Sequence, residues 1–153
     1  EIYQCDWSSD VCSSDLDKTF MERTLMIVKP DVVAKNAIGQ IIARVESEGF
    51  VVRQLRMVEL SVERAGDFYA VHRERPFYGE LVEFMTSGPA VPMVLERENA
   101  VAHLRGYIGP TNSNEAPAGT IRGDFGTDVQ FNAVHASDST DNAAIEIEFF
   151  FGE

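Results

Sequence analysis

The sequence predicts one mixed α/β (α+β) domain, and three observations support this expectation. The chain has 153 residues, of which 44% are hydrophobic and 25% charged, a composition typical of a globular domain with a sizeable core. Residues 23–28 form a short β-type run that ends at Lys29 and Pro30, where the proline forces a change of direction. After this run, apolar residues recur at the i, i+3, i+4, i+7 spacing of an amphipathic helix, namely Ile38, Ile41, Ile42 and Val45.

The elements that follow are predicted from local signals. Gly49 ends the first helix, and residues 50–60 are expected to form the next strand. Ser61 is a suitable N-cap for a helix that carries Phe68, Tyr69 and Val71. Further along the chain we expect a short helix over residues 77–85, a third strand over 91–95, a helix over 99–107 with Val101 and Leu104 inward, and a functional loop over 109–119.

The C-terminal segment is ambiguous. Residues 145–149 alternate between apolar and charged side chains, as a strand does. Ser139, with Asp141 just after it, is instead typical of the start of a helix. Periodicity alone does not choose between these structures.

The formal net charge of −12 limits the classes of partner. A strongly acidic chain disfavours non-specific binding to the phosphate backbone of nucleic acid. A polyanionic substrate would therefore have to be held by a few local cations. The sequence contains no apolar run near the ~20 residues that a membrane-spanning helix needs. We therefore expect a soluble protein with no nucleic acid and no membrane among its partners.

Residues 1–20 differ in character from the rest of the chain. They hold the only tryptophan and both cysteines, Cys5 and Cys12, and they lack the pattern of a secretory signal. We expect a disordered, non-native leader or tag that precedes a natural start at Met21, with residues 21–153 forming the domain. A disulfide or metal hairpin between the cysteines is the alternative. The absence of cysteine from the remaining sequence favours a reducing, cytoplasmic location.

The segment from Asn132 to Ser139 is the strongest candidate for chemistry, because it contains a single histidine, His135. A hydrolase triad within the segment is disfavoured, since near neighbours rarely converge and no Gly-x-Ser-x-Gly elbow is present. Metal ligation is also disfavoured, because His72 and His103 lie far off without ligand spacing. A nucleophilic histidine remains, and a histidine that merely caps or packs is the alternative.

Together with this segment, five further motifs resemble the nucleoside diphosphate kinase family. They are residues 21–24 (Met-Glu-Arg-Thr), 28–31 (Val-Lys-Pro-Asp), 75–78 (Arg-Pro-Phe-Tyr), 86–89 (Thr-Ser-Gly-Pro) and 119–125 (Gly-Thr-Ile-Arg-Gly-Asp-Phe). The resemblance covers Met21 to the end of the chain, with the motifs in family order and spacing. It implies a ferredoxin-like βαββαβ sandwich with a four-stranded antiparallel sheet and helices packed on one face, and it favours a helix at the C-terminus.

The resemblance also implies a catalytic group. His135 would accept the phosphoryl group, Glu146 would orient its imidazole, Ser137 would hold Glu146, and the hydroxyl of Tyr69 would lie near the histidine. Lys29 is assigned to this catalytic group as well as to phosphate binding. Taken alone, Tyr69 reads equally well as a buried tyrosine with a partner elsewhere.

The nucleotide-binding residues are implied in the same way. Phosphate would be held by Lys29, Arg105, Arg122 and Thr111, the sugar hydroxyls by Asn132, and the base by Phe77 with Leu81 one turn on. Without the resemblance, such cations are commonly solvated surface charges, and such apolar residues commonly belong to the core. The planar guanidinium of arginine can nevertheless donate two parallel hydrogen bonds to one phosphate group.

The expected cofactor is Mg²⁺, carried mainly by the nucleotide phosphates, with Asp138 reaching it through water or simply favouring the helix start. A homo-oligomer, tetramer or hexamer, is expected. Two residues depart from the family pattern. Ala136 replaces a usual glycine, so strain is expected there, and Ser113 replaces a common proline, so a more flexible loop is expected. The alternative to an enzyme is a non-catalytic nucleotide-binding or signalling member of the same fold.

Overall fold

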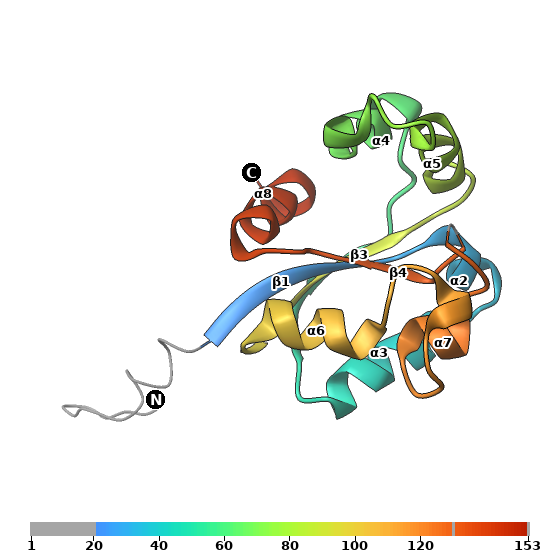
Figure 1. Cartoon of the computed structure of the whole chain (residues 1–153). Coiled ribbons are helices and arrows are strands. Elements are labelled where there is room, and N and C mark those ends of the chain that lie inside the picture. Colours follow the sequence, from blue (N-terminus) through green and yellow to red (C-terminus); the bar gives the residue numbers. More distant parts are fainter. Residues whose placement is uncertain (1–20, 130, 153) are drawn as a thin grey trace.

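The computed structural model describes residues 21–129 and 131–152. Its sheet has four strands in the order β2-β3-β1-β4, and every neighbouring pair is antiparallel. The strands are β1 (Met21–Val28), β2 (Val51–Leu55), β3 (Val91–Glu98) and β4 (Val134–Ala136). The predicted four-stranded antiparallel sheet of a ferredoxin-like fold is therefore confirmed (Figure 1).

Helices cover both faces of this sheet, so the expectation of helices on one face only is wrong (Figure 1). One face carries α3 (Ile38–Ser47), α6 (Ala100–Ile108) and α7 (Ile121–Phe125), and the other carries α4 (Val62–Phe68), α5 (Tyr78–Met85) and α8 (Thr140–Phe151). Short helical turns complete the described chain at α2 (Pro30–Ala34), η1 (Ala70–His72) and η2 (Ser113–Glu115).

The physical reason lies in the central strand β1. Met26 and Val28 belong to the core under α3 and α6, whereas Leu25 and Ile27 belong to the separate core under α4, α5 and α8. All four side chains are fully buried. A continuous apolar run in a strand, in place of alternation, indicates burial on both faces, and this signal is present in the sequence.

Most predicted helix boundaries agree with the structure. Ser61 caps α4 by accepting a hydrogen bond from the Arg64 N–H, and Ser139 caps α8 by accepting one from the Asn142 N–H. The C-terminal segment is thus a helix, as the family resemblance favoured. In α6, Val101 and Leu104 are buried as expected.

Three details differ from the sequence predictions. The second strand ends at Leu55 after a register shift with β3 at residues 52–54, and an isolated bridge beyond it joins Val58 to Ala90. Helix α4 ends at Phe68 and gives way to η1, so Val71 is 86% exposed and does not pack. The short elements α2, α7 and β4 were not predicted individually.

Within the described residues, no helix has the length and apolarity needed to cross a bilayer. The leader expected at residues 1–20, and its alternative cysteine hairpin, lie outside the described residues.

Candidate active site

His135 lies at the centre of β4, opposite Ile27 of β1 in the strand pairing. Its Nε2 is 2.9 Å from Oε1 of Glu146, which α8 supplies. The Ser137 hydroxyl donates to the same carboxylate oxygen at 2.7 Å. The structure thus brings together three of the residues that the sequence assigned to catalysis, with Ser137 fully buried and the other two partly buried.

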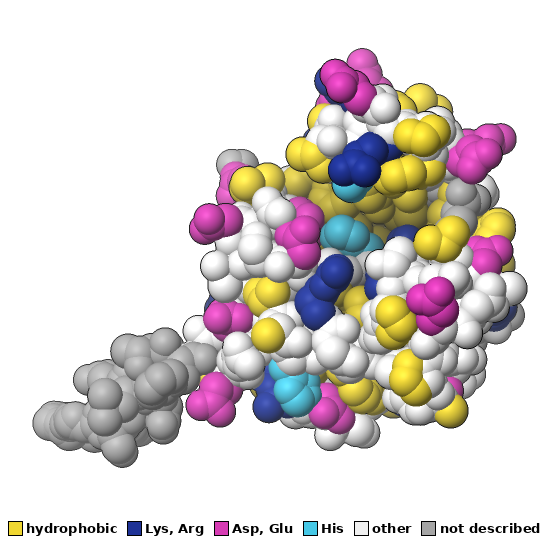
Figure 2. All heavy atoms as spheres, viewed as in Figure 1, with side chains coloured by type: hydrophobic (Ala, Val, Ile, Leu, Met, Phe, Trp, Pro, Cys, Tyr) yellow, Lys and Arg dark blue, Asp and Glu magenta, His cyan; other side chains and the backbone are white. Residues whose placement is uncertain are grey.

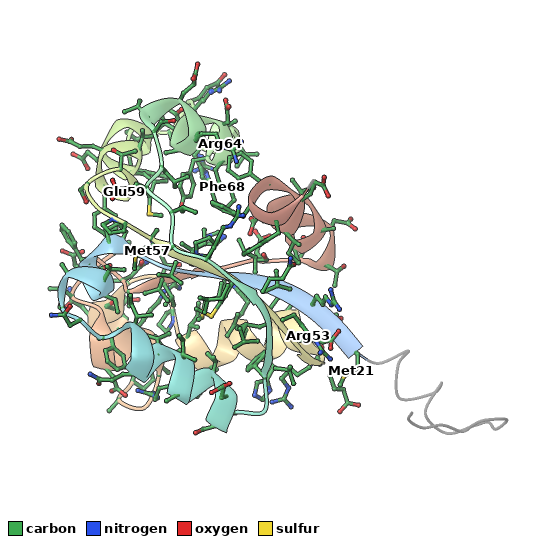
Figure 3. All side chains as sticks on the ribbon, turned by 180° about the vertical axis from the view of Figure 1, so that it is seen from behind. Met21, Arg53, Met57, Glu59, Arg64 and Phe68 are labelled. Atoms are coloured by element: carbon green, nitrogen blue, oxygen red, sulfur yellow. The ribbon has the colours of Figure 1, made fainter. Side chains whose placement is uncertain are left out.

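Two aromatic residues from the end of α4 enclose the imidazole. The ring centroid of Tyr69 lies 6.4 Å from that of His135, and the Phe68 centroid lies 5.5 Å away in an edge-on contact. Phe68 also contacts Phe149 and Phe150 of α8, and Figure 3 shows it pointing from α4 toward that helix. Phe68 was not predicted as a site residue, and its place directly before Tyr69 was the available signal.

The hydroxyl of Tyr69 is buried and has no hydrogen-bond partner among the described residues. Burial, with the nearby charge of Glu146, raises the pKa of Tyr69 above its ordinary value, so this phenol stays protonated. Tyr69 is therefore close to the histidine, as the resemblance implied.

Lys29 is a buried cation at the end of β1. Its Nζ donates a 2.7 Å hydrogen bond to Oδ1 of Asn132. Burial, with repulsion from Arg122, lowers the pKa of Lys29 to about 8, although attraction to Asp31 opposes the shift. The lysine is still charged at neutral pH, and an anionic ligand beside it would relieve an unfavourable local potential.

Two arginines bind the backbone on either side of His135. Arg122 donates to the carbonyl of Val134 at 2.9 Å, and Arg105 donates to the carbonyl of Ala136 at 3.1 Å. Burial, with repulsion from Arg105, lowers the pKa of Arg122 to about 10. The Nε of Arg122 is buried with no partner in the described part of the chain. These cations therefore concentrate positive charge around the histidine of an acidic protein.

Asn132 connects the loop segments at Thr111 and Val129 with this cation cluster through hydrogen bonds. Its Nδ2 donates to the carbonyl of Thr111 at 2.9 Å and to the carbonyl of Val129 at 3.1 Å, while its Oδ1 accepts from Lys29. The Thr111 side chain is exposed. A polyanion beside Lys29 would consequently meet this loop as well.

Phe77 is 44% exposed at the N-cap of α5, and Leu81 packs one turn later against the core under α4, α5 and α8. Ring contacts of 5.5 Å to His72 and of 6.4 Å from His72 to Tyr69 connect Phe77 with the surroundings of His135. His72 was not predicted at the site. Figure 2 shows a hollow on this face, below the α4–α5 region, with hydrophobic, histidine and basic side chains gathered around it.

Asp138 is exposed, and its Oδ1 accepts a hydrogen bond from Asn142 at 2.6 Å. Residues 21–129 and 131–152 contain no group of three His, Cys, Asp or Glu side chains that could hold a metal ion.

The expected backbone strain at Ala136 is absent. Ala136 pairs with Met26 as a regular strand residue and has no positive φ. The strain lies three residues earlier, at Ala133, whose φ is 76°. The other departure from the family pattern, Ser113, is buried as the first residue of η2, and its hydroxyl has no partner in the described chain.

Comparisons with known proteins agree with this geometry. The family model for nucleoside diphosphate kinase matches residues 22–153. The nucleoside diphosphate kinase of Campylobacter fetus is 57% identical over 133 residues, which cover 87% of this chain and 97% of that protein. The enzyme of Campylobacter curvus is 59% identical over 131 residues, covering 86% and 96%.

Solved structures give the same result. The nucleoside diphosphate kinase of Aquifex aeolicus superposes with a TM-score of 0.84 at 54% identity, covering 86% of this chain and 95% of that one. A nucleoside diphosphate kinase of Halobacterium salinarum in complex with CDP superposes with a TM-score of 0.83 at 40% identity, covering 86% and 88%. The match of sequence, fold and coverage is decisive, and the chain belongs to the nucleoside diphosphate kinase family.

Proposed function

We propose that this chain is a nucleoside diphosphate kinase that works by ping-pong transfer through a phosphohistidine at His135. A nucleoside triphosphate gives its γ-phosphoryl group to His135, the nucleoside diphosphate leaves, and a second nucleoside diphosphate takes the phosphoryl group. The observation that carries this proposal is the contact of His135 with Glu146 inside a cluster of three cations, Lys29, Arg105 and Arg122.

The hydrogen bonds favour Nδ1 as the attacking nitrogen. Nε2 of His135 meets a carboxylate oxygen that also accepts from Ser137, so Nε2 carries the proton and donates it. Nδ1 then bears the free lone pair. It forms the new N–P bond while the bond from phosphorus to the oxygen of the departing diphosphate breaks, and Glu146 stabilises the positive charge that develops on the ring.

The remaining residues would bind the nucleotide. Lys29, Arg105 and Arg122, with Thr111 beside them, would bind the phosphates, and Asn132 would bind the sugar hydroxyls while holding Lys29. The exposed ring of Phe77, with Leu81 next to it, would stack on the base. Tyr69 would limit water beside the imidazole, since its ring is buried against it.

Magnesium would arrive as part of the substrate, bound to the nucleotide phosphates. Asp138 has an exposed carboxylate and would reach that ion through water. We further propose a homo-oligomer, tetramer or hexamer, in the cytoplasm, with residues 21–153 as the working domain and no nucleic acid or membrane partner. The alternative, a non-catalytic nucleotide-binding or signalling member, is disfavoured because His135 and Glu146 are both present and in contact.

Initial-rate kinetics test the proposed reaction. If the phosphoryl group passes through the enzyme, varying the triphosphate at several fixed concentrations of diphosphate should give parallel lines in a double-reciprocal plot. Lines that intersect would show that both nucleotides bind before transfer, and the proposal would then be wrong.

Replacing Glu146 by Gln should lower the rate of His135 phosphorylation by about 10²-fold, the lower end of the range for general acid–base groups, because Glu146 orients the imidazole without itself moving a proton. The amide removes the negative charge that stabilises the phosphorylated ring, and it no longer enforces a proton on Nε2. The rate is measured by rapid quench under single turnover. Glu48→Gln is the matched control. Glu48 also contacts a histidine, with 2.8 Å between its Oε2 and Nε2 of His103, but this pair lies away from β4. Equal rates in the two variants would remove Glu146 from the mechanism.

Purine and pyrimidine nucleotides should all serve as substrates. Phe77 offers a stacking face that every base can use, and the assigned polar groups are committed to phosphate and sugar. Stacking discriminates by only ~1–3 kcal/mol. The kcat/KM values for adenine, guanine, cytosine and uracil diphosphates decide the matter. A preference of about 10⁴ for one base would mean that a polar side chain reads the base edge.

A further inference from the structure

The turn before β4 is strained. Ala133 has a φ of 76°, and the N–H of Val134 donates to the carbonyl of Asn132 at 2.9 Å, which closes a γ-turn around Ala133. A residue with a Cβ pays of order 1–3 kcal/mol for such a conformation and keeps it only where its surroundings enforce it. This turn separates Asn132 from the strand that carries His135, so its shape sets their relative positions.

Both backbone groups of Ala133 are held by the segment that follows β1. The carbonyl of Ala133 accepts from the N–H of Lys29 at 2.9 Å, and its N–H donates to Oδ2 of Asp31 at 3.3 Å. The side chain of Lys29 adds the bond to Asn132. The two segments are about a hundred residues apart in sequence, yet three hydrogen bonds join them at the candidate phosphate site.

The carboxylate of Asp31 lies in the first turn of α2, where the backbone N–H groups of Asp31 and Val32 favour its negative charge, and it also reaches across to Ala133. Asp31 would repel a bound phosphate, and burial raises its pKa above the ordinary value although Lys29 opposes the shift. Its second oxygen, Oδ1, is buried without a hydrogen-bond partner among the described residues. Apart from its attraction to Lys29, the favourable contact of this side chain across the site is the one with Ala133.

We propose that Asp31 is a positioning residue, whose carboxylate holds Ala133 in the strained turn and so fixes His135 and Asn132 relative to Lys29. This inference rests on the proposed phosphoryl transfer. Without an acceptor at position 31, Ala133 can relax to negative φ, and the turn displaces the strand that carries the nucleophile. A misplacement of about 1 Å can cost about 10²-fold in rate, even where substrate contacts survive.

Three variants separate this role from a charge effect or a general loss of packing. Asp31→Ala removes the acceptor, and Asp31→Asn removes the charge but keeps an acceptor oxygen. Ala133→Gly makes positive φ accessible without steric cost, so the turn depends less on the acceptor. Asp67→Ala is the control for removing a carboxylate, since Asp67 lies exposed on α4 and pairs with the exposed residue Arg73.

The experiment measures single-turnover phosphorylation of His135 by quench and mass spectrometry, with Kd for ADP measured in parallel by calorimetry. We expect Asp31→Ala to phosphorylate about 10- to 100-fold more slowly, with a much smaller change in Kd. Asp31→Asn should retain most of the rate, and Asp31→Ala should lose less in the Ala133→Gly background. Hydrogen exchange at the Ala133 amide should be faster in Asp31→Ala.

Several results would overturn the inference: a rate in Asp31→Ala close to that of the Asp67→Ala control, equal losses in the alanine and asparagine variants, or effects of Asp31→Ala and Ala133→Gly that simply add. Failure of the proposed function would look different, because the unaltered protein would then form no phosphohistidine. The hydrogen-exchange rate at the Ala133 amide tests whether Asp31 holds the turn, and this measurement does not depend on activity.

Discussion

His135→Ala should abolish phosphoryl transfer, with a loss of at least ~10³-fold, while nucleotide binding survives. The loss is large because the proposed attacking nitrogen belongs to His135, and Arg105 and Arg122 bind the backbone on either side of this residue. Binding survives because the proposed contacts to phosphate, sugar and base come from other residues. Coupled-assay turnover and calorimetric ADP binding measure the two effects separately.

The matched control for this variant is His103→Ala. His103 also meets a carboxylate, Glu48 at 2.8 Å, but it lies on α6 outside the cation cluster. It should keep wild-type turnover. Transfer by His135→Ala at a rate comparable to this control would mean that the nucleophile has been misassigned.

Lys29→Met should have two opposite effects: it should lower kcat/KM by about 10²-fold or more, and it should stabilise the fold by about 1–2 kcal/mol at neutral pH. Activity falls because Lys29 is a buried cation of the proposed phosphate site and also holds Asn132. Stability rises because burial and Arg122 both disfavour the charged amine, whereas methionine has a similar volume and no charge.

The pH dependence of stability follows from the lowered pKa of Lys29 in the folded protein. The pKa of Lys29 is 10.5 in an ordinary setting and about 8 in the folded protein, so between these values the unfolded chain binds more protons than the folded one. The free energy of unfolding should therefore rise with pH through this window, and the rise should be absent in Lys29→Met. Phosphate binding by the free enzyme should weaken above about pH 8, because Lys29 loses its charge.

Urea denaturation above and below pH 8 measures this effect, with Lys35→Met as the control, since Lys35 is exposed at the end of α2. A Lys29→Met protein that is less stable than wild type at neutral pH would show that the hydrogen bond to Asn132 outweighs the cost of the buried charge.

Secondary structure was predictable where the signal was local. Ser61 and Ser139 act as caps because a hydroxyl next to a free helical N–H satisfies it in any context. The alternation at residues 145–149 left strand and helix both open because the window was short. Extended back to Ala143, the inward residues Ala143, Glu146 and Phe150 recur with helical spacing, while Ile145 is 66% exposed.

The site was predictable where a motif carried it, and not where tertiary contacts did. His135, Glu146 and the phosphate cations stand in motifs, and the structure brings them together. Phe68, at the end of α4, and His72, in η1, join the site only through ring contacts made in the folded chain. Asp31 contacts Ala133 across a hundred residues of sequence. The positive φ at Ala133 has no local signal, since an alanine ordinarily avoids it.

Mass spectrometry of the intact protein after brief incubation with a nucleoside triphosphate and Mg²⁺ tests the central claim most directly. The account predicts the gain of one phosphoryl group, located on His135 by fragmentation at neutral pH and removed when a nucleoside diphosphate is added. A protein that turns over nucleotides without ever carrying this group, or that carries it on another residue, would contradict the account.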